Sequence, residues 1–372
     1  LVFDTETTSD ASQTLRFGAY QLRQAGAPFE SGIFYDPEGV EPHELDVLRN
    51  HAAANGLMLR TRDEFVDEVF FERAYQLRAS IVGFNLPFDI SRLAIDHGTA
   101  RTPISDDVHA MRGGFTFKLS HQKIYPNIRV KHMSRRAALI SFAAPMGQPD
   151  SRGQRNRGMK RPVRRGHFID VKTLAGAMLA KGFSLASLSR FLAVPNPKLD
   201  FDDFDGPITD AMVCYAVRDV QATWECYSVL IERYAALKLP QSAPEKIYSE
   251  AGIGKAYIRE MGIAPWRTMQ PDVPADLLAK IMGSYFGGRS EVRIRREISQ
   301  VMLCDFLSMY PTACTLMGLW RYVIADGMTW RDATAETRDF LNHTDLDALQ
   351  SKAAWGQLAT LVRVMPDADV FP

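Results

Sequence analysis

The stretch Leu1-Val2-Phe3-Asp4-Thr5-Glu6 joins three apolar residues to two carboxylates that are separated by one position. A short apolar run of this kind is typical of a buried strand, and alternate side chains of a strand point to the same side of the sheet. Asp4 and Glu6 are therefore expected to face one spot, while Thr5 points away. The pair makes half of a candidate cation site.

Two later segments supply the other half. The run Asn85-Leu86-Pro87-Phe88-Asp89 follows an expected strand, and Tyr215 and Asp219 lie four positions apart in a helix expected over 210–237. Residues four apart on a helix are neighbours, so the phenol and the carboxylate converge. The Asn85 amide can contact a sugar or a terminal phosphate. Together the segments provide four carboxylates and one phenol.

This donor set is suited to hydrolysis of a phosphodiester. Magnesium prefers oxygen ligands, and two divalent ions about 4 Å apart stabilise both the attacking and the leaving oxygen of an in-line displacement. Tyr215 is too weak an acid to serve as a base at neutral pH, so its hydroxyl is expected to orient the water. Each pair alone often arises for structural reasons, but their order and their expected settings together favour a metal site.

Composition narrows the class of protein. Lys plus Arg and Asp plus Glu both number 44, so any surface that binds a polyanion must be local. The four cysteines form no CxxC pair, and no basic and apolar leader or long apolar run is seen, which favours a cytoplasmic protein without a membrane span. The 372 residues suggest two domains. The chain begins inside an expected strand, so we interpret it as a fragment.

Apolar periodicity predicts an α/β fold, a mixed sheet with helices packed on it. Strands are expected at 1–3, 15–22, 29–35, 80–84 and 167–174, and helices at 63–77, 87–95, 184–192 and 210–237. A hairpin with period-two apolar residues is expected within 113–142. After a proline-containing linker at 239–244, helices are expected at 249–261 and 274–282 and a buried strand at 298–306.

An arginine-rich stretch follows the expected hairpin. Residues 151–165 contain seven Lys or Arg side chains and no acidic residue. Two interpretations stay open for this stretch. It is a solvated loop, or it is a loop that contacts phosphates, because clustered cations bind nucleic acid by releasing counterions.

At Asp4, Glu6, Asp89, Tyr215 and Asp219 the chain resembles the proofreading 3'→5' exonuclease domain of family B DNA polymerases, the tyrosine subtype of the DEDD exonucleases. The resemblance implies an RNase H-like fold and a single-stranded 3' end as substrate. It implies that the four acids bind two Mg²⁺ or Mn²⁺ ions and that the tyrosine orients the water.

The same resemblance assigns contacts with DNA. It implies that Thr7, Asn85 and Phe88 hold the terminal nucleotides, with Phe88 as a stacking surface. Lys198 is similar to a phosphate-contacting lysine of the family, although the local spacing differs.

A second resemblance lies downstream. The run Asp305 to Thr312 is similar to the family's polymerase motif A, which implies that Asp305 binds metal, that the amides of Phe306 and Leu307 face the triphosphate, and that Tyr310 excludes a 2'-hydroxyl. Upstream, Tyr285-Phe286-Gly287-Gly288-Arg289 resembles the YxGG element. Its paired glycines let backbone approach a template phosphate, and Arg289 can pair with that phosphate. Tyr285, Gly287, Gly288 and Arg289 are thus candidate DNA contacts.

The sequence therefore predicts an exonuclease domain at 1–238, with an insertion at about 112–166, and a truncated N-terminal part of an α+β polymerase palm at 245–372. No second palm carboxylate motif follows, so polymerisation of dNTPs on a primer-template is not expected from this chain alone. Two alternatives stay open: a stand-alone DEDD nuclease acting on RNA or DNA ends, and an inactive module that only binds nucleic acid. The sequence does not indicate an oligomeric state.

Overall fold

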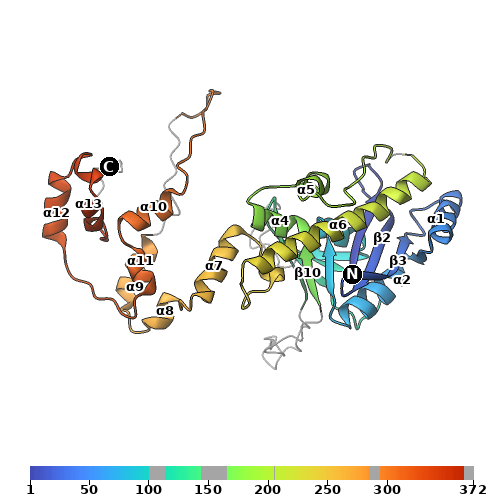
Figure 1. The fold of residues 1–372 in the computed structure, drawn as a ribbon, viewed down its shortest axis with the longest axis horizontal. Coiled ribbons are helices and arrows are strands. Elements are labelled where there is room, and N and C mark those ends of the chain that lie inside the picture. Colours follow the sequence, from blue (N-terminus) through green and yellow to red (C-terminus); the bar gives the residue numbers. More distant parts are fainter. Residues whose placement is uncertain (100–113, 144–165, 205, 285–293, 364–372) are drawn as a thin grey trace. The chain divides into compact units, whose positions relative to one another are not determined.

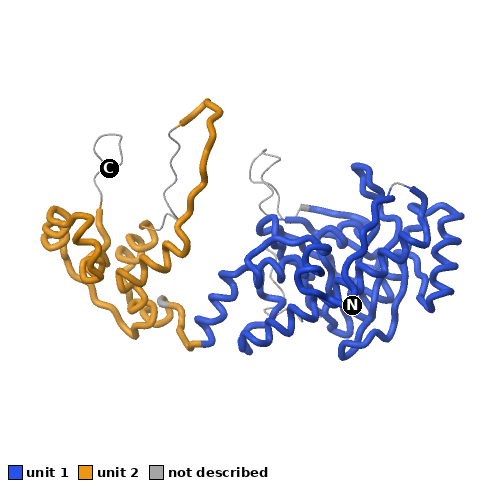
Figure 2. Tube along the Cα trace, turned by 45° about the horizontal axis from the view of Figure 1, so that its top comes forward, with its two compact units in different colours: residues 1–260 blue, residues 261–372 orange. Residues whose placement is uncertain are grey.

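The computed structural model describes residues 1–99, 114–143, 166–204, 206–284 and 294–363 (Figure 1). The chain forms two compact units, residues 1–260 and 261–372 (Figure 2). The arginine-rich stretch at 151–165 and the candidate DNA contacts Tyr285, Gly287, Gly288 and Arg289 lie outside the described residues.

A six-stranded mixed sheet forms the centre of the first unit. Its strands are ordered β10 (His167–Asp170), β5 (Ser80–Gly83), β1 (Val2–Thr7), β2 (Leu15–Gln24), β3 (Ala27–Tyr35) and β4 (Met58–Thr61). Strand β2 runs antiparallel to β1 and β3, and the other neighbouring strands are parallel. The predicted α/β class and mixed sheet are confirmed.

Helices form a layer on one face of this sheet. They are α1 (Pro42–Asn55), α4 (Val171–Leu179), α5 (Leu185–Phe191) and α6 (Asp210–Ala236), and α6 crosses the sheet in Figure 1. Their apolar side chains share one buried cluster with Val2, Phe17 and Ile33 of the strands. Burial of this apolar surface is the main force that holds α6 against β1.

The opposite face is covered by different elements. Helix α3 (Leu86–Arg92), the π-helix η1 (Phe65–Tyr75) and a second sheet share a buried cluster with Phe3 and Phe34. The Phe34 and Phe65 rings stack with centroids 4.0 Å apart. Because Val2 and Phe3 belong to opposite clusters, the alternation along β1 places Asp4 and Glu6 on the side that faces α6.

The second sheet is antiparallel and consists of β6 (Asp96–Thr99), β7 (Phe115–Lys118), β8 (Ile128–Ser134) and β9 (Ala137–Phe142), in that order. The hairpin predicted within 113–142 is confirmed for β8 and β9, and two further strands extend it. Ile128, Val130 and Ile140 are buried in the same cluster as Phe3 and Phe34 of the main sheet. One face of this sheet therefore completes the core.

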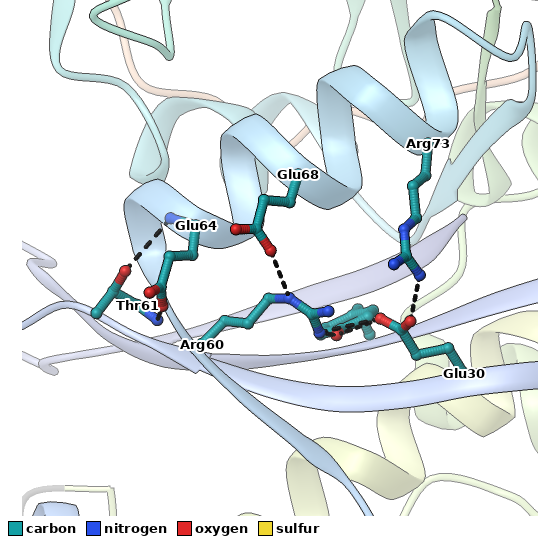
Figure 3. A network of polar contacts seen from close by, with 7 residues as sticks. Glu30, Arg60, Thr61, Glu64, Glu68 and Arg73 are labelled. Atoms are coloured by element: carbon teal, nitrogen blue, oxygen red, sulfur yellow. Dashed lines mark hydrogen bonds and ion pairs between the residues drawn. The ribbon is translucent and has the colours of Figure 1, made fainter.

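A polar network ties β2, β3 and β4 to the π-helix (Figure 3). The buried Arg60 guanidinium contacts Tyr20 Oη, lies 3.0 Å from Glu30 Oε1 and reaches Glu68 Oε2 at 3.4 Å. Arg73 contacts the other oxygen of Glu30. The charges are paired, as buried charges must be to avoid a large desolvation cost. The helix predicted at 63–77 forms as the short α2 (Arg62–Glu64) followed by η1.

Two parts of this unit differ from the sequence prediction. The strand predicted at 167–174 ends at Asp170, because its carboxylate accepts the Thr173 amide and caps α4. Helix α1 and strand β4 were not predicted. Helix α1 begins with a capping box between Glu41 and Glu44 and ends at Gly56, whose φ of 63° suits glycine.

The linker predicted at 239–244 lies inside the first unit. Leu239 and Ile247 are buried in a small cluster with Tyr234 and with Ala256 of α7 (Glu250–Glu260), around the short 3₁₀ helix η2 (Pro244–Lys246). These contacts hold the proline-containing segment to the end of α6, so the units divide after residue 260 instead.

The regular elements among the described residues of the second unit are all helices. Its helices are α8 (Trp266–Met269), α9 (Ala275–Gly283), α10 (Met309–Leu316), α11 (Trp320–Ile324), α12 (Thr334–His343), η3 (Ala348–Gln350) and α13 (Lys352–Gln357). The strand predicted at 298–306 is wrong: this segment has no strand conformation, and Val301 and Leu303 are exposed. A strand needs a partner for its hydrogen bonds, and the described part of this unit offers none. Among the described helices, none is long and apolar enough to cross a membrane.

Candidate metal centre

Three carboxylates from two elements meet between the sheet and α6. One oxygen each from Asp4 and Glu6 of β1 and Asp219 of α6 lies within 4.8 Å of the others, so the group could hold a metal ion. Glu6 is 8% exposed and Asp219 is 1% exposed. The convergence of the two half-sites that their spacing predicts is thus present for these three acids.

The fourth predicted acid, Asp89, arrives from α3. Its Oδ1 accepts a hydrogen bond of 2.8 Å from Thr5 Oγ1, the side chain between the two acids of β1. Asp89 is not one of the three clustered carboxylates, but it is close enough for the charge of Asp4 to affect its pKa. Burial, and then the Asp4 charge, raise the pKa of Asp89 well above its usual range. Asp89 therefore lies beside the cluster, held there by Thr5.

The acids repel one another in the absence of a cation. Burial and the charge of Asp219 raise the pKa of Asp4 to about 7. Burial, then the charges of Asp4 and Asp219, raise the pKa of Glu6 well above its ordinary value. Desolvation and neighbouring like charge both disfavour the ionised carboxylate. Full ionisation of the three carboxylates is therefore unfavourable, and a bound positive charge would stabilise the ionised cluster.

Two carboxylate oxygens indicate where positive charge fits. Asp89 Oδ2 and Asp219 Oδ1 are buried and have no hydrogen-bond partner among the described residues. Buried polar atoms normally have partners, so such atoms call for a bound water or ion. Oxygen donors from carboxylates are the ligands that Mg²⁺ and Mn²⁺ prefer. The residues present fit a hard divalent cation.

Lys198 contributes a charge of its own. Its ammonium pairs with Asp219 Oδ2 and lies 4.3 Å from the centroid of the Tyr215 ring. Burial opposes the charged lysine, but the carboxylate outweighs it and raises the pKa of Lys198. The side chain that resembles a phosphate-contacting lysine thus reaches the acidic cluster and neutralises part of it.

Tyr215 is held rigidly beside these groups. Its ring packs against the neighbouring rings of Phe201 and Phe204, whose centroids are 5.4 and 5.5 Å away. The buried Arg16 fixes that loop by donating to the Phe204 and Gly206 carbonyl oxygens. Burial and the charge of Asp219 raise the pKa of Tyr215, so the phenol is neutral at physiological pH. A neutral hydroxyl can orient a water but cannot act as its base.

One residue that sequence reasoning missed is Asp170. Asn85 has φ 73° and ψ 40°, an unusual left-handed conformation. The backbone N–H groups of Asn85 and Leu86 donate to Asp170 Oδ1 at 2.8 and 3.1 Å. Lys172 Nζ donates to Asn85 Oδ1 at 3.2 Å. Asp170 thereby holds the turn that leads into α3 and Asp89. The Asp170 to Thr173 spacing, a helix-start pattern, was the available signal.

The remaining DNA-contact candidates of this unit, Thr7 and Phe88, are partly exposed. Thr7 ends β1 just after a register irregularity that follows Glu6, and it is half-buried. Phe88 is also half-buried, and the Arg92 guanidinium lies 5.0 Å from its ring centroid.

The predicted polymerase centre is not assembled in the described residues; the other group of metal-ligand side chains found there is His51, Asp210 and Cys214, in the first unit. Asp305 is exposed and belongs to none of the described groups of metal-ligand side chains. Phe306, Leu307 and Tyr310 are 76%, 94% and 59% exposed. The polymerase half of the sequence prediction thus rests on its motif alone.

Comparison with family models, with curated proteins and with solved structures gave no match.

The raised pKa of Asp4 leads to a prediction for the metal-free protein. Its folded pKa of about 7 exceeds the ordinary 3.8, so the folded state binds the proton more tightly and this group's contribution to stability is lost as the pH rises from about 4 to 7. Asp4→Asn removes that loss. The measurement is the free energy of unfolding in urea, with EDTA present, for the variant and the wild type. We expect the difference between them to change in favour of the variant by about 1–3 kcal/mol between pH 5 and pH 8. If this advantage of the variant instead decreased as the pH rises, the ionised Asp4 carboxylate would be stabilised in the folded protein rather than repelled.

Proposed function

We propose that this chain is a divalent-metal-dependent 3'→5' exonuclease that shortens single-stranded DNA. The observation that carries the proposal is the buried cluster of Asp4, Glu6 and Asp219, beside Tyr215 and the unpaired oxygen of Asp89. These are the residues at which the sequence resembles the exonuclease domain of family B DNA polymerases. The mixed sheet, with helices on both faces, supports an RNase H-like assignment.

Each residue has a defined part in this reaction. Asp4, Glu6, Asp89 and Asp219 would hold two Mg²⁺ or Mn²⁺ ions, which polarise the phosphate and lower the pKa of the attacking water when bound. The neutral Tyr215 hydroxyl orients that water toward the phosphorus. Its ring is supported by the adjacent rings of Phe201 and Phe204.

The 3' end of the strand is held by other residues. Asn85, Phe88 and Thr7 are proposed to hold the terminal nucleotides. The hydrogen bond that the Asn85 backbone N–H donates to Asp170, and the one that the Asn85 side chain accepts from Lys172, keep Asn85 in its left-handed conformation.

The second unit is proposed to be the first part of a family B-like palm, on the strength of the run Asp305 to Thr312. Its acid would serve polymerisation of dNTPs only with palm residues that this chain does not supply. The four cysteines, all among the described residues, are free thiols, which fits a cytoplasmic setting.

The proposal is tested by incubating the purified chain with 5'-labelled single-stranded DNA and, in parallel, with RNA of the same sequence. We expect a descending ladder on DNA that requires Mg²⁺ or Mn²⁺ and stops with EDTA, with nucleoside monophosphates as products. Equal or better trimming of RNA would favour a stand-alone RNA nuclease. Binding of DNA without trimming in either ion would show an inactive binding module.

A further inference from the structure

The second sheet carries more positive than negative charge. Residues 114–142 contain six Lys or Arg side chains and no Asp or Glu, in a chain whose net charge is zero. Among the described residues of its four strands, Asp96 of β6 is the one carboxylate, and its Oδ1 accepts the His97 amide. The excess charge is therefore a local property of this sheet.

The strand geometry collects cations on the outer face. In β8, Ile128 and Val130 are buried, whereas Arg129 and Lys131 alternate with them and are exposed. Arg129 is paired with Thr116 of β7, and Lys118 lies two residues further along the same face. Side chains two apart on a strand are separated by about 6.7 Å, so the guanidinium and the two ammonium groups form an array of separate charges.

These cations are available to a ligand. Arg129 and Lys131 make no ion pair with any described side chain. Asp96, on the edge strand β6, lies opposite Lys118 of β7. Placing like charges close together without partners is unfavourable, and a polyanion relieves it by releasing its counterions as it binds.

We propose that the outer face of the second sheet binds the phosphate backbone of a nucleic acid strand. The recognition is mainly electrostatic, because most described apolar and aromatic side chains of these strands belong to the inner cluster, whereas Leu139, opposite Lys131, and the exposed Met133 do not. The site goes beyond the proposed function, since it is separate from the acidic centre and requires no divalent ion. In a nuclease it would retain the strand between successive cleavages.

The test uses the double variant Arg129→Glu/Lys131→Glu and a 5'-labelled single-stranded DNA in EDTA, with binding followed by fluorescence anisotropy. Between about 50 and 200 mM NaCl, we expect the slope of log Kd against log salt to fall by about 1.4, since each phosphate contact of a single strand contributes about 0.7. Affinity at the lower salt concentration is expected to fall at least tenfold.

The matched control is Arg233→Glu/Lys238→Glu, the same charge change at two exposed positions near the end of α6. It should keep the wild-type slope to within experimental error. Equal losses in both variants, or wild-type binding by the sheet variant, would overturn the proposal. So would wild-type binding to vesicles of anionic phospholipid but not to DNA. Absence of trimming in Mg²⁺ with this binding intact would refute the proposed nuclease and leave the binding face standing.

Discussion

Asp89→Ala is expected to abolish cleavage of single-stranded DNA, by at least about a thousandfold, whereas Asp305→Ala leaves it nearly unchanged. Asp89 lies beside the clustered acids and has a buried oxygen with no partner in the described structure, so its removal takes away a proposed metal ligand. Asp305 is exposed in the other unit. Initial rates on 5'-labelled DNA measure both variants.

Asp89→Asn separates chemistry from folding. Its amide oxygen can still accept the hydrogen bond from Thr5, so the turn and α3 should stay in place while the charge is lost. We expect the same loss of rate, a near-native circular dichroism spectrum and weaker Mn²⁺ binding by calorimetry. Equal loss of cleavage in the Asp89 and Asp305 variants would refute the division into two centres, and full activity of Asp89→Asn would refute the metal site.

Gly18→Ala should be the most damaging conservative change in the sheet. A methyl group at this position of β2 would lie 2.4 Å from the Asp4 backbone oxygen and 2.3 Å from Phe34 Cζ. The ring can shift, but the backbone oxygen belongs to the central strand that carries two of the acids. Overpacking of this kind typically costs about 1–3 kcal/mol, and we expect the upper end of that range together with a large loss of cleavage. Urea unfolding and initial rates measure the two effects.

Gly98→Ala is the control for this substitution. It also lies in a strand, β6, but an added methyl group meets no atom of the described residues within 4 Å. Its stability should change by less than about 0.5 kcal/mol, and its activity should stay at the wild-type level. If Gly18→Ala were equally mild, the approach of β2 to the backbone of Asp4 would be looser than described.

The sequence predicted those parts of the site that depend on local periodicity. Alternation in β1 was enough to place Asp4 and Glu6 on one side, and helical spacing was enough to bring Tyr215 and Asp219 together. The long helix was predicted at 210–237 and is observed at Asp210–Ala236. Each of these inferences needs only the geometry of a single strand or helix.

What the sequence could not show depends on contacts between distant residues. The hydrogen bonds from Asn85 and Leu86 to Asp170 join residues more than eighty positions apart, so no local sequence pattern predicts them. The pairing of Lys198 with Asp219 depends on the path of the intervening loop. Residues 298–306 have the composition of a buried strand, but composition cannot provide the neighbouring strand that pairing requires.

Translation order gives the architecture of the first unit a further consequence. Strand β1 is made before the other strands of its sheet, but its parallel neighbour β5 and the next strand β10 begin at residues 80 and 167, and Asp219 follows Glu6 by 213 positions. Pairings so remote in the chain form slowly, because a long loop must close before any contact is gained. A nascent chain on the ribosome thus carries its first two acids long before the carboxylate that completes the trio. Nuclease competence would arrive as a late folding event, after α6 has emerged.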